Sequence, residues 1–134
     1  MNTLTSELEA LIAQLNTALA TKNIALYDAL MVDDPSCTVV GTGRNEFNIG
    51  LAQVRAQAQR DWAAFESLSF NWTVRSANSA GDVAWAACDG LAVVGVGGQR
   101  IETPMRMTLV AQKVHGAYRV AQAHVSVPDM SGQS

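Results

Sequence analysis

TPMRMTLVAQKVHGAYRVAQAHVSVP, residues 103–128, is the segment from which the architecture of this chain can be predicted. It holds two runs of alternating side chains, rich in β-branched and apolar residues, on either side of His115-Gly116. This pattern is typical of a β-hairpin. Gly116 fits the left-handed third position of a three-residue loop, Val114 to Gly116, made of a type I turn closed by a bulge.

A three-residue loop pairs even-numbered residues of one strand with even-numbered residues of the other. One face of the ribbon then pairs Arg106 with His124, Thr108 with Gln122 and Val110 with Val120. The other face is wholly apolar and holds Met105, Met107, Leu109, Ala111, Ala121, Ala123, Val125 and Val127. We expect the mixed face to line a cavity. We expect the apolar face to be covered by a second copy of the chain, because so large an apolar patch is not left in water.

The segments before the hairpin change from a helical period to a period of two. Apolar residues recur at helical spacing over 4–19, over 24–31 after the capping residue Asn23, and over 51–66. A short strand is expected at 37–40, and a glycine-rich connecting loop at 41–50. From Leu68 the side chains alternate, which predicts a strand, a turn at 78–82, a long strand at 83–96 and a turn at 97–98. The predicted fold class is α+β, with a curved antiparallel sheet wrapped around three N-terminal helices.

Composition excludes several classes of protein. The chain has 134 residues, of which 49% are hydrophobic and 16% charged, and a net charge of −3 with nine basic residues. We therefore expect one domain at 1–128 with a tail at 129–134, no nucleic-acid partner and no disordered composition. No signal peptide or membrane-spanning run is recognised, so a cytoplasmic protein is expected. Cys37 and Cys88 have no metal or redox spacing, which predicts buried free thiols, and we expect no metal and no cofactor.

Four passages together resemble a known group of proteins. They are the paired N-terminal helices ending in Asp33-Asp34, GTGRNEFNIGLAQVRAQAQRDWAAF at 41–65, GDVAWAACD at 81–89, and the closing pattern R-x-T…G-x-Y-R-V-x-Q-x-H-V-S-V-P. Over residues 8–128 the chain resembles the nuclear transport factor 2-like superfamily, and within it the SnoaL-like group. The resemblance implies a cone-shaped sheet that encloses an apolar cavity, with helices closing one side and the back of the sheet often forming a dimer. Members include isomerases, cyclases and dehydratases, and also non-catalytic association domains, so the fold alone does not define the function.

His124 and Asp89 are the predicted proton-transfer residues. A neutral imidazole in a cavity can act as a general base or orient an acidic ligand, but His124 can equally hydrogen-bond Ser126 or a backbone carbonyl within a strand. Asp89 interrupts an apolar strand, and a partly buried carboxylate needs a partner or a raised pKa. Arg106 can clamp a carboxylate, or it can pair with Asp89 or Glu102.

The remaining predicted ligand contacts are Gln122, Thr108, Trp85, Trp62 and Phe47. Trp62 and Trp85 also suit the protein core, and Glu46 lies either at the cavity mouth or in an exposed loop. The leading hypothesis is a dimeric small-molecule-binding protein whose cavity suits an apolar molecule with an acidic group. One alternative is an isomerase, dehydratase or cyclase. The other is an assembly module with a filled cavity.

Overall fold

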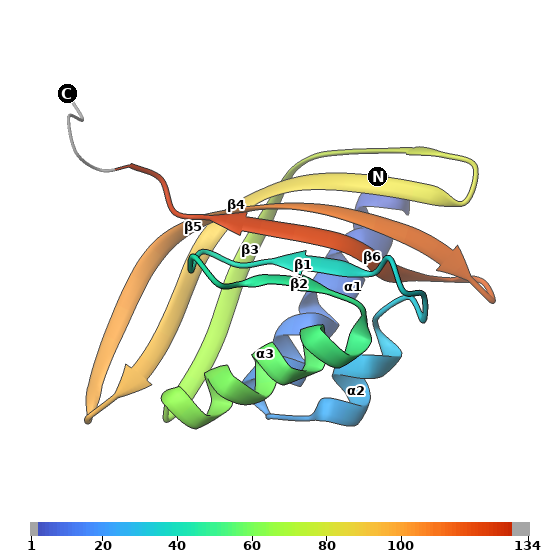
Figure 1. Cartoon of the computed structure of the whole chain (residues 1–134). Helices are drawn as coiled ribbons and strands as arrows, with labels where there is room; N and C mark the ends of the chain where they lie inside the picture. Colours follow the sequence, from blue (N-terminus) through green and yellow to red (C-terminus); the bar gives the residue numbers. More distant parts are fainter. Residues whose placement is uncertain (1–2, 130–134) are drawn as a thin grey trace.

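The computed structural model describes residues 3–129, which form three helices packed against one curved sheet of six strands (Figure 1). The helices are α1 (Thr3–Ala20), α2 (Ile24–Ala29) and α3 (Leu51–Ala64). The strands are β1 (Thr38–Val40), β2 (Phe47–Ile49), β3 (Ser67–Ala80), β4 (Val83–Val96), β5 (Gln99–Val114) and β6 (Ala117–Ser126). The predicted α+β class and the curved sheet wrapped around three helices are confirmed. Of the predicted tail, residues 130–134 lie outside the described part of the chain.

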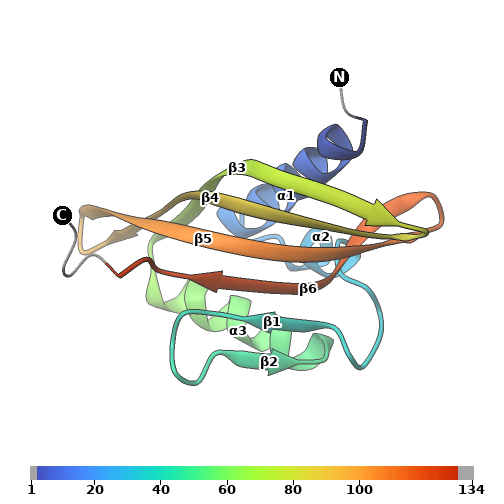
Figure 2. The ribbon, with the colours of Figure 1, turned by 90° about the horizontal axis from the view of Figure 1, so that it is seen from above.

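The sheet is mixed rather than wholly antiparallel. Its strand order is β2-β1-β6-β5-β4-β3, and β1 runs parallel to β6 while the other neighbours are antiparallel (Figure 2). The segment 41–50, predicted to be a connecting loop, contains the strand β2. This strand pairs with β1 as a short hairpin at the edge of the sheet. All three helices lie on one side of the sheet. We call this side the concave face and the opposite side the convex face.

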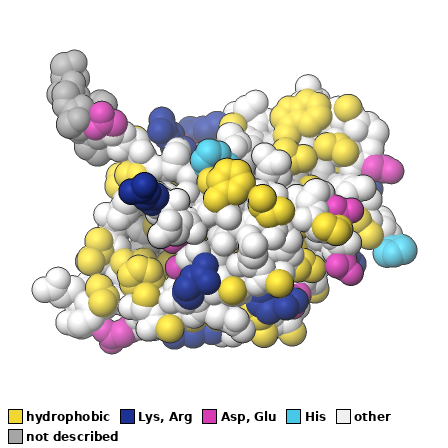
Figure 3. Space-filling model, in the orientation of Figure 1, with side chains coloured by type: hydrophobic (Ala, Val, Ile, Leu, Met, Phe, Trp, Pro, Cys, Tyr) yellow, Lys and Arg dark blue, Asp and Glu magenta, His cyan; other side chains and the backbone are white. Residues whose placement is uncertain are grey.

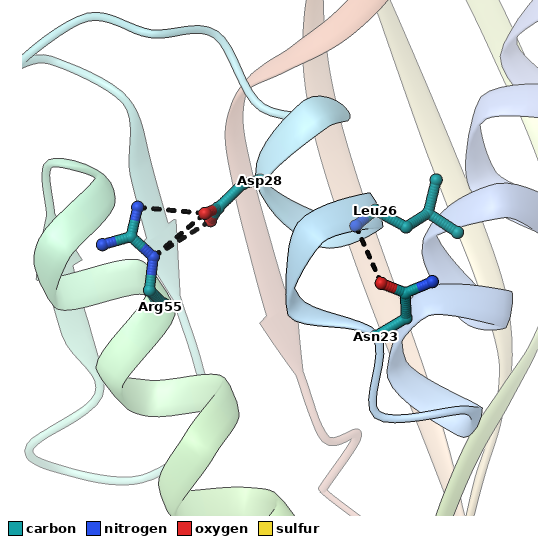
Figure 4. A network of polar contacts seen from close by, with 4 residues as sticks. All are labelled: Asn23, Leu26, Asp28 and Arg55. Atoms are coloured by element: carbon teal, nitrogen blue, oxygen red, sulfur yellow. Dashed lines mark hydrogen bonds and ion pairs between the residues drawn. The ribbon is translucent and has the colours of Figure 1, made fainter.

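Local signals in the sequence account for the helix boundaries. The side chain of Asn23 accepts a hydrogen bond from the backbone N–H of Leu26 at 3.1 Å, so the predicted cap of α2 is confirmed (Figure 4). Gly50 precedes α3 with a φ of 86°, a left-handed conformation that glycine adopts at little cost. Its N–H also donates to the carbonyl oxygen of Cys37 at 2.7 Å, which joins the start of α3 to the segment before β1.

The turn between β5 and β6 has two residues, not the predicted three. His115 and Gly116 have φ values of 51° and 82°, the pair of positive φ angles that defines a type I′ hairpin turn. Val114 therefore lies opposite Ala117. A two-residue turn pairs even-numbered residues with odd-numbered ones, so by itself it would place Arg106 and His124 on opposite faces.

A bulge in β6 reverses this offset. Ala111 lies opposite Val120, whereas Val110 lies opposite Gln122, so that Ala121 is an extra residue in β6. Beyond the bulge, even-numbered residues again face even-numbered ones. The predicted sets of residues on each face are therefore correct except at the bulge, where Val120, predicted on the mixed face opposite Val110, lies opposite Ala111 on the apolar face. The predicted pairs are displaced: Arg106 lies opposite Ser126, and Thr108 lies opposite His124.

The predicted direction of the two faces is wrong. Met107, Leu109 and Ala111, from the wholly apolar face, are 6%, 1% and 0% exposed and pack against the helices in the core. Thr108 and His124, from the mixed face, are exposed on the convex face. Burial of apolar area is the dominant favourable term in folding, so the face with more apolar area covers the helices. The wholly apolar face therefore does not form the predicted dimer surface.

Two further expectations concern the cysteines and membranes. Cys37 and Cys88 are buried free thiols, as predicted. Burial raises the pKa of both thiols, that of Cys88 to about 11, so neither is an activated nucleophile at neutral pH. Within residues 3–129, no helix is long and apolar enough to cross a membrane.

Candidate functional site

A cavity of about 560 Å³ lies between the concave face and the helices. Its volume is within the range typical of small-molecule sites. The walls are mainly apolar, and the residues that line them include Met31, Ala58, Phe70, Trp72, Met105 and Met107. The predicted cavity is thus present, and the wholly apolar face of the β5–β6 ribbon lines it.

A polar cluster lies on one wall of this apolar cavity and is organised around Gln57 of α3. The Nε2 atom of Gln57 donates to the Glu46 carboxylate at 3.1 Å and to Oδ1 of Asp61 at 3.0 Å. Its Oε1 atom accepts from Arg60 at 2.8 Å and from the amide of Asn48 at 3.5 Å. Glu46, Asn48, Gln57 and Asp61 all line the cavity. Gln57 therefore joins two carboxyl groups from different segments at one place.

Tyr27 contributes a hydroxyl group to the same cavity. The residue is only 7% exposed and lines the cavity, yet within residues 3–129 its hydroxyl has no hydrogen-bond partner. No fully buried side-chain nitrogen or oxygen of the described chain lacks a partner, so this hydroxyl retains some exposed surface, and Tyr27 is one of the residues that line the cavity. Burial raises the pKa of Tyr27, and the negative charge of Asp61 raises it further. The hydroxyl therefore stays protonated and is free to contact a ligand.

Asp61 is a carboxyl group without a counter-ion. Its Oδ1 atom accepts a hydrogen bond from Gln57, whereas its Oδ2 atom accepts no hydrogen bond from a described residue. No described residue forms an ion pair with Asp61. Burial raises the pKa of Asp61; the hydrogen bond from Gln57 opposes this shift, and the nearby charge of Glu46 adds to it. A raised carboxyl pKa in a cavity is a common property of functional sites.

Two contacts between helices hold Tyr27 and Asp61 in place. Arg55 of α3 binds Asp28 of α2 through Nε at 3.1–3.2 Å and through Nη2 at 3.0 Å (Figure 4). The indole N–H of Trp62 donates to the carbonyl oxygen of Leu19 in α1 at 2.9 Å. Because Asp28 follows Tyr27 and Trp62 follows Asp61, these two bonds fix the helical segments that carry the site.

The predicted polar site residues of the ribbon lie outside the cavity. Arg106, Thr108, Gln122 and His124 are exposed on the convex face, and none of them lines the cavity. The prediction failed because it placed functional polar groups inward and left the wholly apolar face for another protein. Arg106 and His124 are also not opposite one another, so they do not form the predicted clamp for one anionic group.

Asp89, the other predicted proton-transfer residue, is also on the convex face. Its carboxylate accepts a hydrogen bond from Nε of Arg75 at 2.7 Å, and this bond holds the pKa of Asp89 below its usual range. Its neighbour in the sheet, Arg106, was the predicted partner, but Arg75 takes that role. A surface carboxylate that is paired and easily ionised is not suited to proton transfer inside the cavity.

The three aromatic residues predicted as ligand contacts are not part of the cavity wall either. Trp85 and Phe47 are 44% and 63% exposed. Both lie on the convex face, in rows of paired residues that cross the sheet. Trp62 is partly buried and packs against the core, in keeping with its alternative interpretation. Glu46, for which two positions were open, lines the cavity.

The residues that sequence reasoning missed carry a recognisable signal. Asp61 lies seven residues after Val54 and three after Ala58, and therefore shares their face of α3. A carboxylate within an apolar helical stripe is a polar group directed toward the interior. Tyr27 lies within the apolar helical spacing predicted over 24–31 and is 7% exposed. The contact of Gln57 with Glu46 joins distant segments and has no comparable sequence signal.

The charge of the cavity wall contradicts the expected preference for an acidic ligand. The lining residues described include the carboxyl groups of Glu46 and Asp61 and contain no lysine, arginine or histidine. An anionic ligand would meet like charge in apolar surroundings, where such repulsion is weakly screened. Within residues 3–129, no group of three His, Cys, Asp or Glu side chains is arranged to hold a metal ion.

Comparisons with known proteins agree with this architecture. The sequence pattern of the SnoaL-like domain matches residues 8–130, and the chain belongs to this family. No curated protein sequence gave a significant match.

Three solved structures illustrate the similarity. A protein of the nuclear transport factor 2-like family from Streptomyces avermitilis, named as a candidate dehydratase, is 16% identical with a TM-score of 0.84, and the alignment covers 95% of this chain and 97% of that one. A nuclear transport factor 2-like superfamily protein from Salmonella enterica serovar Typhimurium is 18% identical with a TM-score of 0.84, covering 97% and 94%. A candidate calcium/calmodulin-dependent protein kinase II association domain from Xanthomonas campestris is 23% identical with a TM-score of 0.76, covering 92% and 87%. At these identities the likeness shows the fold.

Replacing the charge of Asp61 should stabilise the protein at neutral pH. Because its pKa is raised on folding, the stability linked to this group is complete below the ordinary carboxyl pKa and is lost as the pH rises through the folded value. Asp61→Asn keeps an oxygen for the bond from Gln57 and removes this loss. We expect its free energy of unfolding at pH 7 to exceed that of the wild type by about 1 kcal/mol or less, because water screens the charge of a partly exposed group, and the gain to vanish in acid.

Chemical denaturation at several pH values measures this difference. Asp33→Asn, which removes an exposed acid from the loop after α2, controls for the change in net charge. A gain that is equally large in acid would show that the charge of Asp61 is not its cause.

Proposed function

We propose that this protein binds a small, mostly apolar molecule inside the cone. The cavity supports this proposal, because it is large, mainly apolar and bordered by few polar groups. Sites for small molecules commonly combine an apolar wall with a small number of placed polar groups. The free hydroxyl of Tyr27 would provide one such contact, and Trp72 and Phe70 would border the body of the ligand.

A second candidate function is proton-transfer catalysis of the isomerase, dehydratase or cyclase kind. It is favoured by two groups that line the cavity, the Asp61 carboxyl group with its raised pKa and the Tyr27 hydroxyl. The carboxylate of Asp61 would remove a proton from a carbon next to a carbonyl group, and the electron pair would move to the carbonyl oxygen. Tyr27 would donate a hydrogen bond to the resulting enolate. His124 and Asp89 take no part in this scheme.

We also propose a homodimer through the convex face. Two rows of residues that are paired across neighbouring strands lie on this face. One row runs from Trp85 in β4 to Ile49 in β2, and the other runs from Ala87 in β4 to Phe47 in β2. Trp85, Ile49 and Phe47 are 44%, 52% and 63% exposed, and Figure 3 shows hydrophobic side chains at the surface over β1 and β2. Exposed apolar side chains at both ends of a continuous sheet face are typical of an interaction surface.

A neutral aromatic alcohol should bind in the cavity. With 2-naphthalenemethanol as the probe, we expect saturable quenching of tryptophan fluorescence, because Trp72 lines the cavity. Ala92→Phe on the concave face of β4 should weaken binding roughly tenfold or more by filling the space. Val93→Phe, on the convex face of the same strand and outside the rows proposed for the dimer, is the control. Equal effects of the two substitutions would place the probe outside the cavity.

Catalysis can be separated from binding by hydrogen exchange. If Asp61 transfers protons, the protein should accelerate loss of the α-hydrogen NMR signal of 1-tetralone in deuterium oxide. Asp61→Asn should reduce this acceleration by roughly 100-fold or more, the usual contribution of a general base. Tyr118→Phe, which changes a tyrosine outside the cavity lining, should leave the rate unchanged. No acceleration by the wild type would leave binding as the function.

Light scattering at micromolar concentration tests the homodimer, with a dimer mass expected for the wild type. Trp85→Glu should shift the protein to monomer, because it replaces an exposed apolar side chain of the proposed interface with a charge. Val96→Glu, at the exposed end of β4 away from these rows, should not. A monomeric wild type would contradict the proposal.

A further inference from the structure

We propose that the cavity is built for an apolar amine, whose ammonium group is held by the Asp61 carboxylate and the Tyr27 hydroxyl. This inference rests on the proposed function, binding of a small molecule in the cavity, and assigns the chemical class of that molecule. It differs from the expectation drawn from the sequence, which placed cationic side chains in the cavity and therefore favoured an acidic ligand.

Asp61 provides the first part of the argument. It is a partly buried carboxylate with one free oxygen, and within residues 3–129 no cation pairs with it. The adjacent Arg60 directs its Nη2 atom at Gln57 instead. Charged groups inside proteins are normally paired, because an unpaired charge is costly to remove from water. A cation brought by the ligand would supply the missing partner.

Tyr27 provides an independent second observation. Its side chain is more than nine-tenths buried, its hydroxyl is unpartnered within the described chain, and the residue lines the cavity. Asp61 lines the same cavity, and its negative charge raises the pKa of Tyr27. The phenolic oxygen can accept a hydrogen bond from an ammonium group while Asp61 balances its charge.

Asn48 completes a set of three acceptors. It is 5% exposed and lines the cavity, and its amide nitrogen is directed at Gln57. Its side-chain oxygen accepts no bond from any described residue. An ammonium group has three N–H donors, and the cavity lining includes three residues with an acceptor that no described residue occupies: Asp61 Oδ2, Tyr27 Oη and Asn48 Oδ1.

The rest of the cavity suits a ligand with an aromatic or alicyclic ring system and a positively charged group at one end. Phe65, Phe70 and Trp72 line the cavity, and aromatic rings attract cations as well as packing against apolar groups. Glu46 adds negative charge, although its own carboxylate is occupied by Gln57 and by the N–H of Gly43 at 2.8 Å. The described lining contains no lysine, arginine or histidine, so a cationic ligand would meet no like charge there; the charge of Arg60, adjacent to Asp61 in α3, lowers the pKa of Asp61.

Three probes of matched shape test this assignment by calorimetry at pH 7. They are 2-naphthylmethylamine, which is cationic, 2-naphthalenemethanol, which is neutral, and 2-naphthoate, which is anionic. We expect the amine to bind roughly tenfold or more tighter than the alcohol, as a charge-assisted hydrogen bond allows, and the anion to bind most weakly. Asp61→Asn should remove the preference for the amine and leave the affinity for the alcohol within about threefold.

The controls separate this inference from the proposed function. Asp33→Asn removes an exposed acid that is not part of the cavity lining and should retain the preference, which excludes an effect of net charge. Equal affinities for the amine and the alcohol, or an unchanged preference in Asp61→Asn, would overturn the amine assignment while leaving a cavity-binding protein. Failure of all three probes to bind would overturn both.

Discussion

The pairing of β5 with β6 is the constraint on which the rest of the structure depends. Side chains alternate along a strand, so the register of this central pair decides which residues face the helices. The type I′ turn at His115-Gly116 would by itself set Met107 and His124 on the same face, and the extra residue Ala121 prevents this. Beyond the bulge, one face is continuous and apolar. That face covers the helices and lines the cavity, and the sheet curves around it.

Much of the fold could be predicted because its signals are local. The helical spacing of 51–66 and the alternation after Leu68 each lie within one segment, and the cap of α2 needs only Asn23 and the residues that follow it. The prediction that even-numbered residues of β5 lie opposite even-numbered residues of β6 was also correct beyond the bulge, although for the wrong reason. A three-residue loop and a two-residue turn followed by a bulge give the same alternation. The sequence alone does not distinguish them, and the pairs shift accordingly.

The site was predicted poorly because function was sought in the ribbon. Polar residues such as Arg106 and His124 were assigned to the interior, although the hydrophobic effect favours the face formed by Met107 and Leu109. Asp61 shares the face of α3 that the helical spacing predicts to be buried, so its inward position could have been predicted from the sequence. Its contact with Gln57, and through it with the loop residue Glu46, depends on the tertiary packing of α3 beside the β1–β2 hairpin. No single segment contains that information.

We infer that the ligand binds at the apolar concave face of the sheet and not at the convex face. Methyl NMR of the methionines tests it most directly, because Met31, Met105 and Met107 line the cavity from α2's end and from β5. Titration with 2-naphthylmethylamine should shift these three methyl signals and leave the Trp85 indole signal unchanged. Shifts confined to Trp85, with the three methionine signals unmoved, would contradict the account.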